Sequence, residues 1–135
     1  MRTASWDSTT PILDPARERT SNRVELVGYI GGLPEHRYTA DGVPTARLSL
    51  ATHRWHEEDG QMVQSTDWHT VVAFGDLASP CEDLRPGDLV RITGWLHTRV
   101  WTERGGARRR QTEVVLTSLM KMSRAATQGT LPFPG

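Results

Sequence analysis

Residues 67–74 read Asp-Trp-His-Thr-Val-Val-Ala-Phe, a run rich in aromatic and β-branched side chains and free of glycine and proline. Residues of these types favour β-strands. Because successive side chains of a strand point to opposite faces, Trp68 and Phe74 share one face. The mainly polar residues 56–65 precede this run and contain Asp59-Gly60, a favourable turn pair. The stretch therefore predicts a long hairpin that leads into a strand at 67–74.

Two further strand patterns lie before this hairpin. Apolar residues and glycine alternate with other residues over 24–30, until Gly-Gly-Leu-Pro at 31–34 ends the pattern. After a turn at Asp41-Gly42, apolar side chains at 46, 48 and 50 alternate with arginine, serine and alanine. This alternation is expected of a strand with one face in a core.

The sequence after residue 74 predicts a helix and two more strands. Leu77, Cys81 and Leu84 have helical spacing, which predicts one short helix over 76–84, and Arg-Pro-Gly-Asp at 85–88 ends it. Residues 89–101 alternate as a strand does, and after a hairpin around Gly105-Gly106 the pattern resumes over 112–122.

Five strands with one short helix between the third and the fourth is the order of the OB-fold, a five-stranded, partly open Greek-key barrel of the all-β class. We expect residues 22–122 to form this domain. Residues 1–21 have no sustained periodicity and predict a flexible leader, and the Ala, Thr, Gln, Gly and Pro after 123 predict a short disordered tail over 123–135.

Composition limits the class of protein. A length of 135 residues fits one domain with terminal segments. Sixteen basic and sixteen acidic residues cancel, so any case for a nucleic-acid partner depends on where the charges lie. The single cysteine, Cys81, cannot form an internal disulfide, and no apolar stretch suits a membrane span or a signal peptide. These features favour a reducing cytoplasm.

The sequence contains no recognisable catalytic or cofactor motif. It has no glycine-rich phosphate loop and no zinc-type Cys or His spacing. His53 and His56 lack a cysteine partner, so we expect no bound metal and no cofactor. A nuclease would need a convergent carboxylate cluster for Mg²⁺, whereas the acidic residues 57–59 are adjacent in one loop. We therefore expect that the chain is not an enzyme.

Five blocks of the sequence resemble the successive signature blocks of bacterial single-stranded DNA-binding proteins. The Trp-His-x-Val-Val-x-Phe-Gly block that starts at Trp68 is the most specific, and the blocks follow the family's order and spacing over residues 22–122: residues 22–28, 37–39, 66–75, 94–101 and 112–115. The resemblance implies sequence-independent binding of single-stranded DNA in replication, recombination and repair. It also implies a nucleoid-associated homotetramer with His69 at a subunit interface.

A sequence-tolerant binder of single strands needs flat side chains for the bases and a cationic track for the phosphates. By their match to the family motif, the expected stacking residues are Trp55, Trp68, Phe74 and Trp101; the alternative for each is a place in the core. The arginines that could form the phosphate track are Arg23, Arg37, Arg47, Arg54, Arg99, Arg108, Arg109 and Arg110. For the run 108–110 the alternative is a solvated hairpin.

The sequence also departs from the family. Thr70, Asp76, Pro86 and Val100 stand where the family often has Lys or Arg, which predicts fewer phosphate contacts. Leu131-Pro132-Phe133 resembles the Pro-Phe ending through which relatives recruit repair proteins, but no acidic residue follows Glu113, which argues against recruitment. The competing interpretation is a primosomal replication-restart accessory protein, also an OB-fold. The tail favours it slightly, whereas the aromatic residues and the Trp-His block favour single-strand binding.

Overall fold

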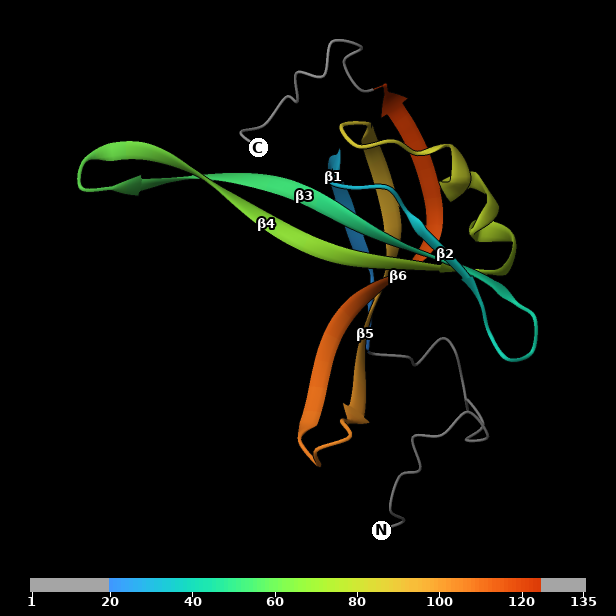
Figure 1. The fold of residues 1–135 in the computed structure, drawn as a ribbon. Coiled ribbons are helices and arrows are strands. Elements are labelled where there is room, and N and C mark those ends of the chain that lie inside the picture. The colour runs from blue at the N-terminus through green and yellow to red at the C-terminus, as the bar shows by residue number, and fades with distance from the viewer. Residues whose placement is uncertain (1–19, 125–135) are drawn as a thin grey trace.

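The computed structural model describes residues 20–124, which form a strand-rich domain. Two terminal segments, 1–19 and 125–135, lie outside the described residues, and with them the predicted leader and tail, including Leu131-Pro132-Phe133. In chain order the strands are β1 (Val24–Ile30), β2 (Glu35–Tyr38), β3 (Pro44–Glu58), β4 (Gln61–Phe74), β5 (Leu89–Thr102) and β6 (Arg108–Ser123) (Figure 1).

The strands form one sheet in the order β1-β5-β6-β4-β3-β2. An additional antiparallel pairing of Tyr29 with Ala51 and of Ile30 with Leu50 joins β1 to β3, so that β1, β5, β6, β4 and β3 close into a ring. The contact between β4 and β6 is parallel, and the other neighbours are antiparallel. Two long hairpins, β3–β4 and β5–β6, extend away from this barrel (Figure 1). The five predicted strands are present in the predicted order.

The core of the barrel consists of the apolar side chains that alternate along the strands. Each such side chain contributes about 1.5–3 kcal/mol when it leaves water completely. Because the core takes every second residue, the intervening side chains of the same strands cover the outer face of the barrel. The largest core members are Ile30, Leu48, Leu50, Val71, Leu84, Val90, Ile92 and Leu116.

The predicted short helix between β4 and β5 is present, with 3₁₀ geometry. The segment forms two short 3₁₀ helices, η2 (Gly75–Leu77) and η3 (Ser79–Asp83), in which backbone N–H groups of residues 78, 81 and 84 each bond the carbonyl three residues earlier. Pro80 explains the tighter geometry in part, because it has no N–H to donate within an α-helix. The predicted apolar spacing still serves the core, since Cys81 and Leu84 are buried.

The predicted long hairpin with a turn at Asp59-Gly60 is present. The polar residues on both sides of the turn are paired strand, because β3 and β4 pair up to Glu58 and Gln61. Asp59 and Gly60 both have positive φ (52° and 80°), as a tight two-residue hairpin turn requires. The short strand β2 was not predicted; all four of its residues are exposed.

Candidate nucleic-acid interface

Two of the expected stacking residues lie on the outer face of β4. Val71 and Ala73 point into the core, and the alternate positions place Trp68 and Phe74 outside. Trp68 is 57% exposed and Phe74 is 47% exposed. Such exposure of large rings on the body of the barrel leaves them open to contact with a ligand.

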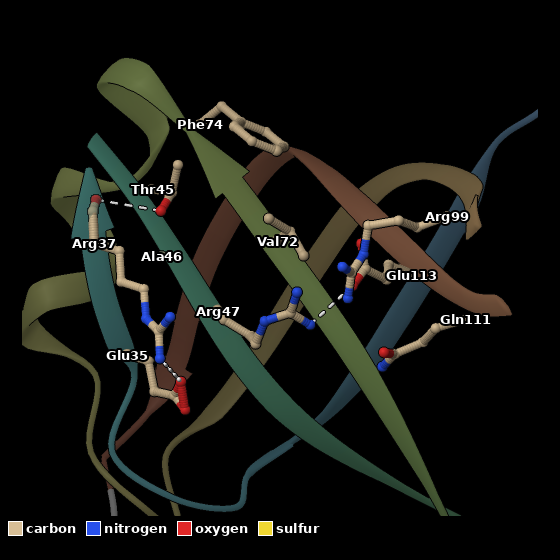
Figure 2. A pocket seen from close by; sticks show the side chains of 10 residues that line it. All are labelled: Glu35, Arg37, Thr45, Ala46, Arg47, Val72, Phe74, Arg99, Gln111 and Glu113. Atoms are coloured by element: carbon tan, nitrogen blue, oxygen red, sulfur yellow. Dashed lines mark hydrogen bonds and ion pairs between the residues drawn. The ribbon is translucent and has the colours of Figure 1, made fainter. Parts of the chain in front are cut away.

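An open groove of about 450 Å³ runs across this outer face (Figure 2). Phe74 and Val72 of β4 line it together with residues of β2, β3 and the β5–β6 hairpin. Its lining residues are Glu35, Arg37, Thr45, Ala46, Arg47, Val72, Phe74, Arg99, Gln111 and Glu113.

A buried carboxylate holds two of the predicted arginines together in this groove. Glu113 is only 5% exposed, and Arg47 Nη1 donates to its Oε2 over 2.8 Å. Arg99 Nη2 lies 3.6 Å from the same oxygen. Figure 2 shows the Arg47 guanidinium reaching towards the Glu113 carboxylate, with the Arg99 side chain beside it. A guanidinium has five N–H donors, so a single carboxylate leaves each arginine with donors for a further anion.

The β5–β6 hairpin carries the next aromatic residue, Trp101. The Arg99 guanidinium carbon lies 4.4 Å from the centroid of the Trp101 ring, a cation–π distance, and Trp101 is therefore only partly exposed. Arg109 pairs with Trp101 across the hairpin and donates from Nε to Glu103 over 2.9 Å. Arg108 and Arg110 are exposed at the alternate positions.

The β3–β4 hairpin carries Trp55, whose side chain is 64% exposed. The neighbouring residue Arg54 points to the opposite side of the strand, where its Nε donates to Asp67 over 2.8 Å. The hydrogen bond and the guanidinium charge hold the pKa of Asp67 below its usual value, and the same hydrogen bond raises the pKa of Arg54. Arg54 therefore points to the side of β3 opposite Trp55, although the sequence predicted that both residues contact the DNA.

The remaining predicted residues are dispersed. Arg37 is highly exposed at the groove, with Glu35 3.9 Å away, and Arg23 is exposed just before β1. His69 is adjacent to Trp68 and therefore points to the opposite side of β4. It is half-buried, and its Nε2 lies 2.8 Å from Thr52 Oγ1. These positions leave His69 off the aromatic face.

Sequence reasoning missed Glu113, Gln111 and Thr45 as groove residues. Gln111 Nε2 donates to Thr70 Oγ1 over 3.3 Å. Thr70 is one of the positions where the family resemblance led us to expect a cation. No sequence signal marks Glu113 as the partner of Arg47, because the two residues are 66 positions apart. Only the packing of β6 beside β4 brings them together.

Within residues 20–124, no cluster of three or more His, Cys, Asp or Glu side chains could hold a metal ion. Within the same range, no helix has the length and apolar character needed to cross a membrane.

An OB-fold that displays exposed rings among arginines on one outer face has the arrangement of single-stranded nucleic-acid binders. The comparisons with known proteins specify the class further. Residues 21–122 match the model of the single-strand binding protein family, and the chain belongs to this family. It is 36% identical over 106 residues to single-stranded DNA-binding protein 1 of Xylella fastidiosa (strain 9a5c), a match that covers 76% of this chain and 78% of the relative.

A solved structure gives the same result for the fold. The chain is similar to an SSB of Plasmodium falciparum in complex with ssDNA, with a TM-score of 0.72 and 27% sequence identity. The match covers 79% of this chain and 99% of the other. The predicted OB-fold and the predicted family are therefore confirmed.

Proposed function

We propose that the outer face of β3, β4 and the β5–β6 hairpin binds single-stranded DNA without sequence preference. The bases stack on Trp55, Trp68, Phe74 and Trp101, and arginines bordering the groove hold the phosphates. The observation that carries this proposal is the groove itself, which is lined by the exposed Phe74 ring together with Arg47 and Arg99. Stacking tolerates any base, because every base has a flat face.

The arginine pair with Glu113 supports this proposal in a second way. A buried carboxylate that orients two guanidinium groups fixes their positions before a ligand arrives, so less side-chain entropy is lost on binding. Arg99 also covers one side of Trp101, where it presents a planar cation beside a planar ring. Both elements suit a chain of alternating bases and phosphates.

The role that follows is protection of unpaired DNA during replication, recombination and repair in the cytoplasm, without a chemical step on the DNA. Bases stacked on these rings and phosphates held by the arginines are shielded from other proteins. Relatives that bear the family name bind single-stranded DNA, and the described groove offers the means to do the same.

Tryptophan fluorescence tests the proposal directly. Oligo-dT should quench the emission strongly, whereas duplex DNA of equal length should not, because its bases are already stacked on one another. Trp68→Ala should weaken binding of oligo-dT by about 1–3 kcal/mol and leave the fold intact, since the ring is exposed. Equal quenching by both forms of DNA would contradict single-strand binding.

We further propose that the protein is a homotetramer with His69 at a subunit contact. His69 lies on the side of β4 opposite to Trp68, so a contact there would leave the aromatic face free. Stacking surfaces from several subunits would then act together on one strand of DNA.

A further inference from the structure

Strand β5 carries a contact between two rings, Trp95 and His97, in addition to the cation–π contact between Arg99 and Trp101. Trp95, His97, Arg99 and Trp101 occupy alternate positions of β5 and therefore share one face of the strand. The rings of Trp95 and His97 meet edge to face, with centroids 5.9 Å apart and planes at 72°. The face of β5 thus carries two adjacent units, each made of a flat ring and a nitrogen-bearing side chain.

The strand register places Trp95 on the same outer face as the groove. Trp95 pairs with Val115 of β6, Val115 pairs with Val72 of β4, and Val72 pairs with Arg47 of β3. Paired residues of neighbouring strands lie on the same side of a sheet. Val72 and Arg47 line the groove, and His97 pairs with Glu113, another lining residue. Trp95 therefore continues the groove surface towards β1.

Trp95 is open to solvent and has a cation beside it. Its side chain is 40% exposed. On the β1 side, Val24 pairs with Gly94, and the Asn22 side chain bonds the backbone N–H and carbonyl of Leu96, which places the exposed Arg23 opposite Trp95. The row across the sheet has an arginine at each end and an indole between them.

We propose that Trp95 and His97 form an additional base-stacking subsite, which extends the path of single-stranded DNA along β5 beyond Arg99, with Arg23 as its phosphate contact. The subsite rests on the proposed function and adds a fifth aromatic residue to it. A nucleic acid fits this row because it alternates flat bases with anionic phosphates. An apolar protein surface laid over the same row would remove the exposed Arg23 from water without offering its charge an anion.

A variant in which Trp95 is the only indole tests the contact. Trp6, Trp55, Trp68 and Trp101 are replaced by Phe, which keeps a flat ring at each position. Oligo-dT should quench the remaining emission in this variant, with binding verified independently by gel shift. If oligo-dT binds and the Trp95 emission does not change, the subsite is wrong. If wild-type emission is unaffected by oligo-dT, the proposed function itself fails.

The affinity of a single variant provides the second measurement. Trp95→Ala should bind oligo-dT about 5-fold or more weakly, which is the lower end of the range for one stacked base, and Trp95→Phe should restore most of the loss. The loss should be confined to the longer oligonucleotides in a series from about 4 to about 16 nucleotides, the range of OB-fold site sizes. Trp95 lies six residues from Trp101, roughly 20 Å along an extended strand, so short oligonucleotides need not reach it.

Leu96→Ala is the matched control. Leu96 is 48% exposed, adjacent in sequence and on the opposite face of β5, so its removal should leave the affinity unchanged. Equal affinities of Trp95→Ala and Leu96→Ala at every length would overturn the proposal. Light scattering of Trp95→Ala measures its assembly state. If this state differs from that of the wild type, and DNA does not quench the Trp95 emission of the variant with that single indole, the ring belongs to a protein contact instead.

Discussion

The indole of Trp68 lies against the backbone of Gly31. A Cβ atom added at Gly31 would be 2.3 Å from Cζ3 and 2.8 Å from Cη2 of Trp68, distances at which one of the groups must move. Gly31 follows the last residue of β1 and donates its N–H to the carbonyl of Ser49 in β3. The glycine thus provides the surface against which the exposed ring is positioned.

Gly31→Ala should therefore weaken binding of single-stranded DNA by displacing the Trp68 ring. The expected loss in binding free energy is about 1–3 kcal/mol if the stacked base is lost completely, and less if the ring moves only partly. Oligo-dT titration measures the affinity and thermal unfolding measures stability. Gly32→Ala is the control, because a Cβ there meets no atom within 4 Å. Equal affinities of the two variants would show that Trp68 needs no support from Gly31.

The fold could be predicted well because the core uses strict alternation. Leu48, Leu50, Val71 and Ile92 lie in runs of period two, and each is buried. Strand β2 escaped prediction because its four residues are all exposed and show no alternation. It exists through backbone pairing with β3, which a pattern of side chains does not record.

The site could be predicted only in part. The match to the family motif selected Trp55, Trp68 and Phe74, and all three are exposed. Glu113 could not be found from sequence, since its function depends on β6 lying beside β4. Trp95 had a usable signal, because its alternation with Trp101 along a predicted strand already placed both rings on one face.

Glu113→Gln should lower stability and steepen the salt dependence of DNA binding. The substitution leaves Arg47 and Arg99 without a buried counter-charge, at an expected loss of about 1–3 kcal/mol in the free energy of unfolding. The arginines, no longer neutralised, should pair more fully with phosphate, and one additional phosphate raises the slope of log affinity against log salt by about 0.7. Urea unfolding and titrations at several salt concentrations measure the two effects.

Glu103→Gln serves as the control for stability, because its pair with Arg109 is exposed and such pairs contribute at most about 1 kcal/mol. If Glu113→Gln proved as stable as Glu103→Gln, the buried ion pair would have no structural role.

His69→Asp should dissociate the proposed tetramer. An aspartate at this position would lose the contact with Thr52 and lie near the carboxylate of Asp67, which would place a second negative charge at the proposed subunit contact. Light scattering should detect smaller species, and titration should show a lower affinity for long oligo-dT. His36→Asp, on the exposed strand β2, should keep the assembly intact. A monomeric wild-type protein would contradict the proposal outright.

Cys81 should be unreactive in the folded protein. Burial raises the pKa of its thiol from 9.0 to about 11, so very little thiolate is present at pH 8. Thiol reagents should modify it slowly until the protein unfolds. In the unfolded chain the thiol ionises at lower pH, so its contribution to stability is complete below about pH 9 and is lost as the pH rises to about 11.

The measurement for this thiol is unfolding in urea at pH 8 and pH 10. The wild type should lose about 1–2 kcal/mol more than Cys81→Ala over this interval, because only the wild type carries the titrating thiol. Equal losses would show that the thiol is not protected by burial.

The salt dependence of binding tests the role of the arginine run at the end of the β5–β6 hairpin. The sequence predicts fewer phosphate contacts, because Thr70, Asp76, Pro86 and Val100 stand at positions where the family resemblance led us to expect cations, so the wild-type slope of log affinity against log salt should be shallow. Each phosphate paired on a single strand contributes about 0.7 to this slope. Changing residues 108–110 together from Arg to Ser should lower it further if the hairpin follows the DNA backbone, and affinity should fall alike for every base composition.

The hairpin geometry refines this expectation for single changes. Arg109 lies opposite Trp101, although Glu103 offsets part of its charge, whereas Arg110 lies opposite Val100 at the alternate position. Arg109→Ser should therefore lower the affinity for oligo-dT more than Arg110→Ser does, because only the first arginine adjoins a stacking ring. If the triple variant changed neither slope nor affinity, the run would be only a solvated part of the hairpin, and the phosphate contacts would have to come from Arg37, Arg47 and Arg99 around the groove.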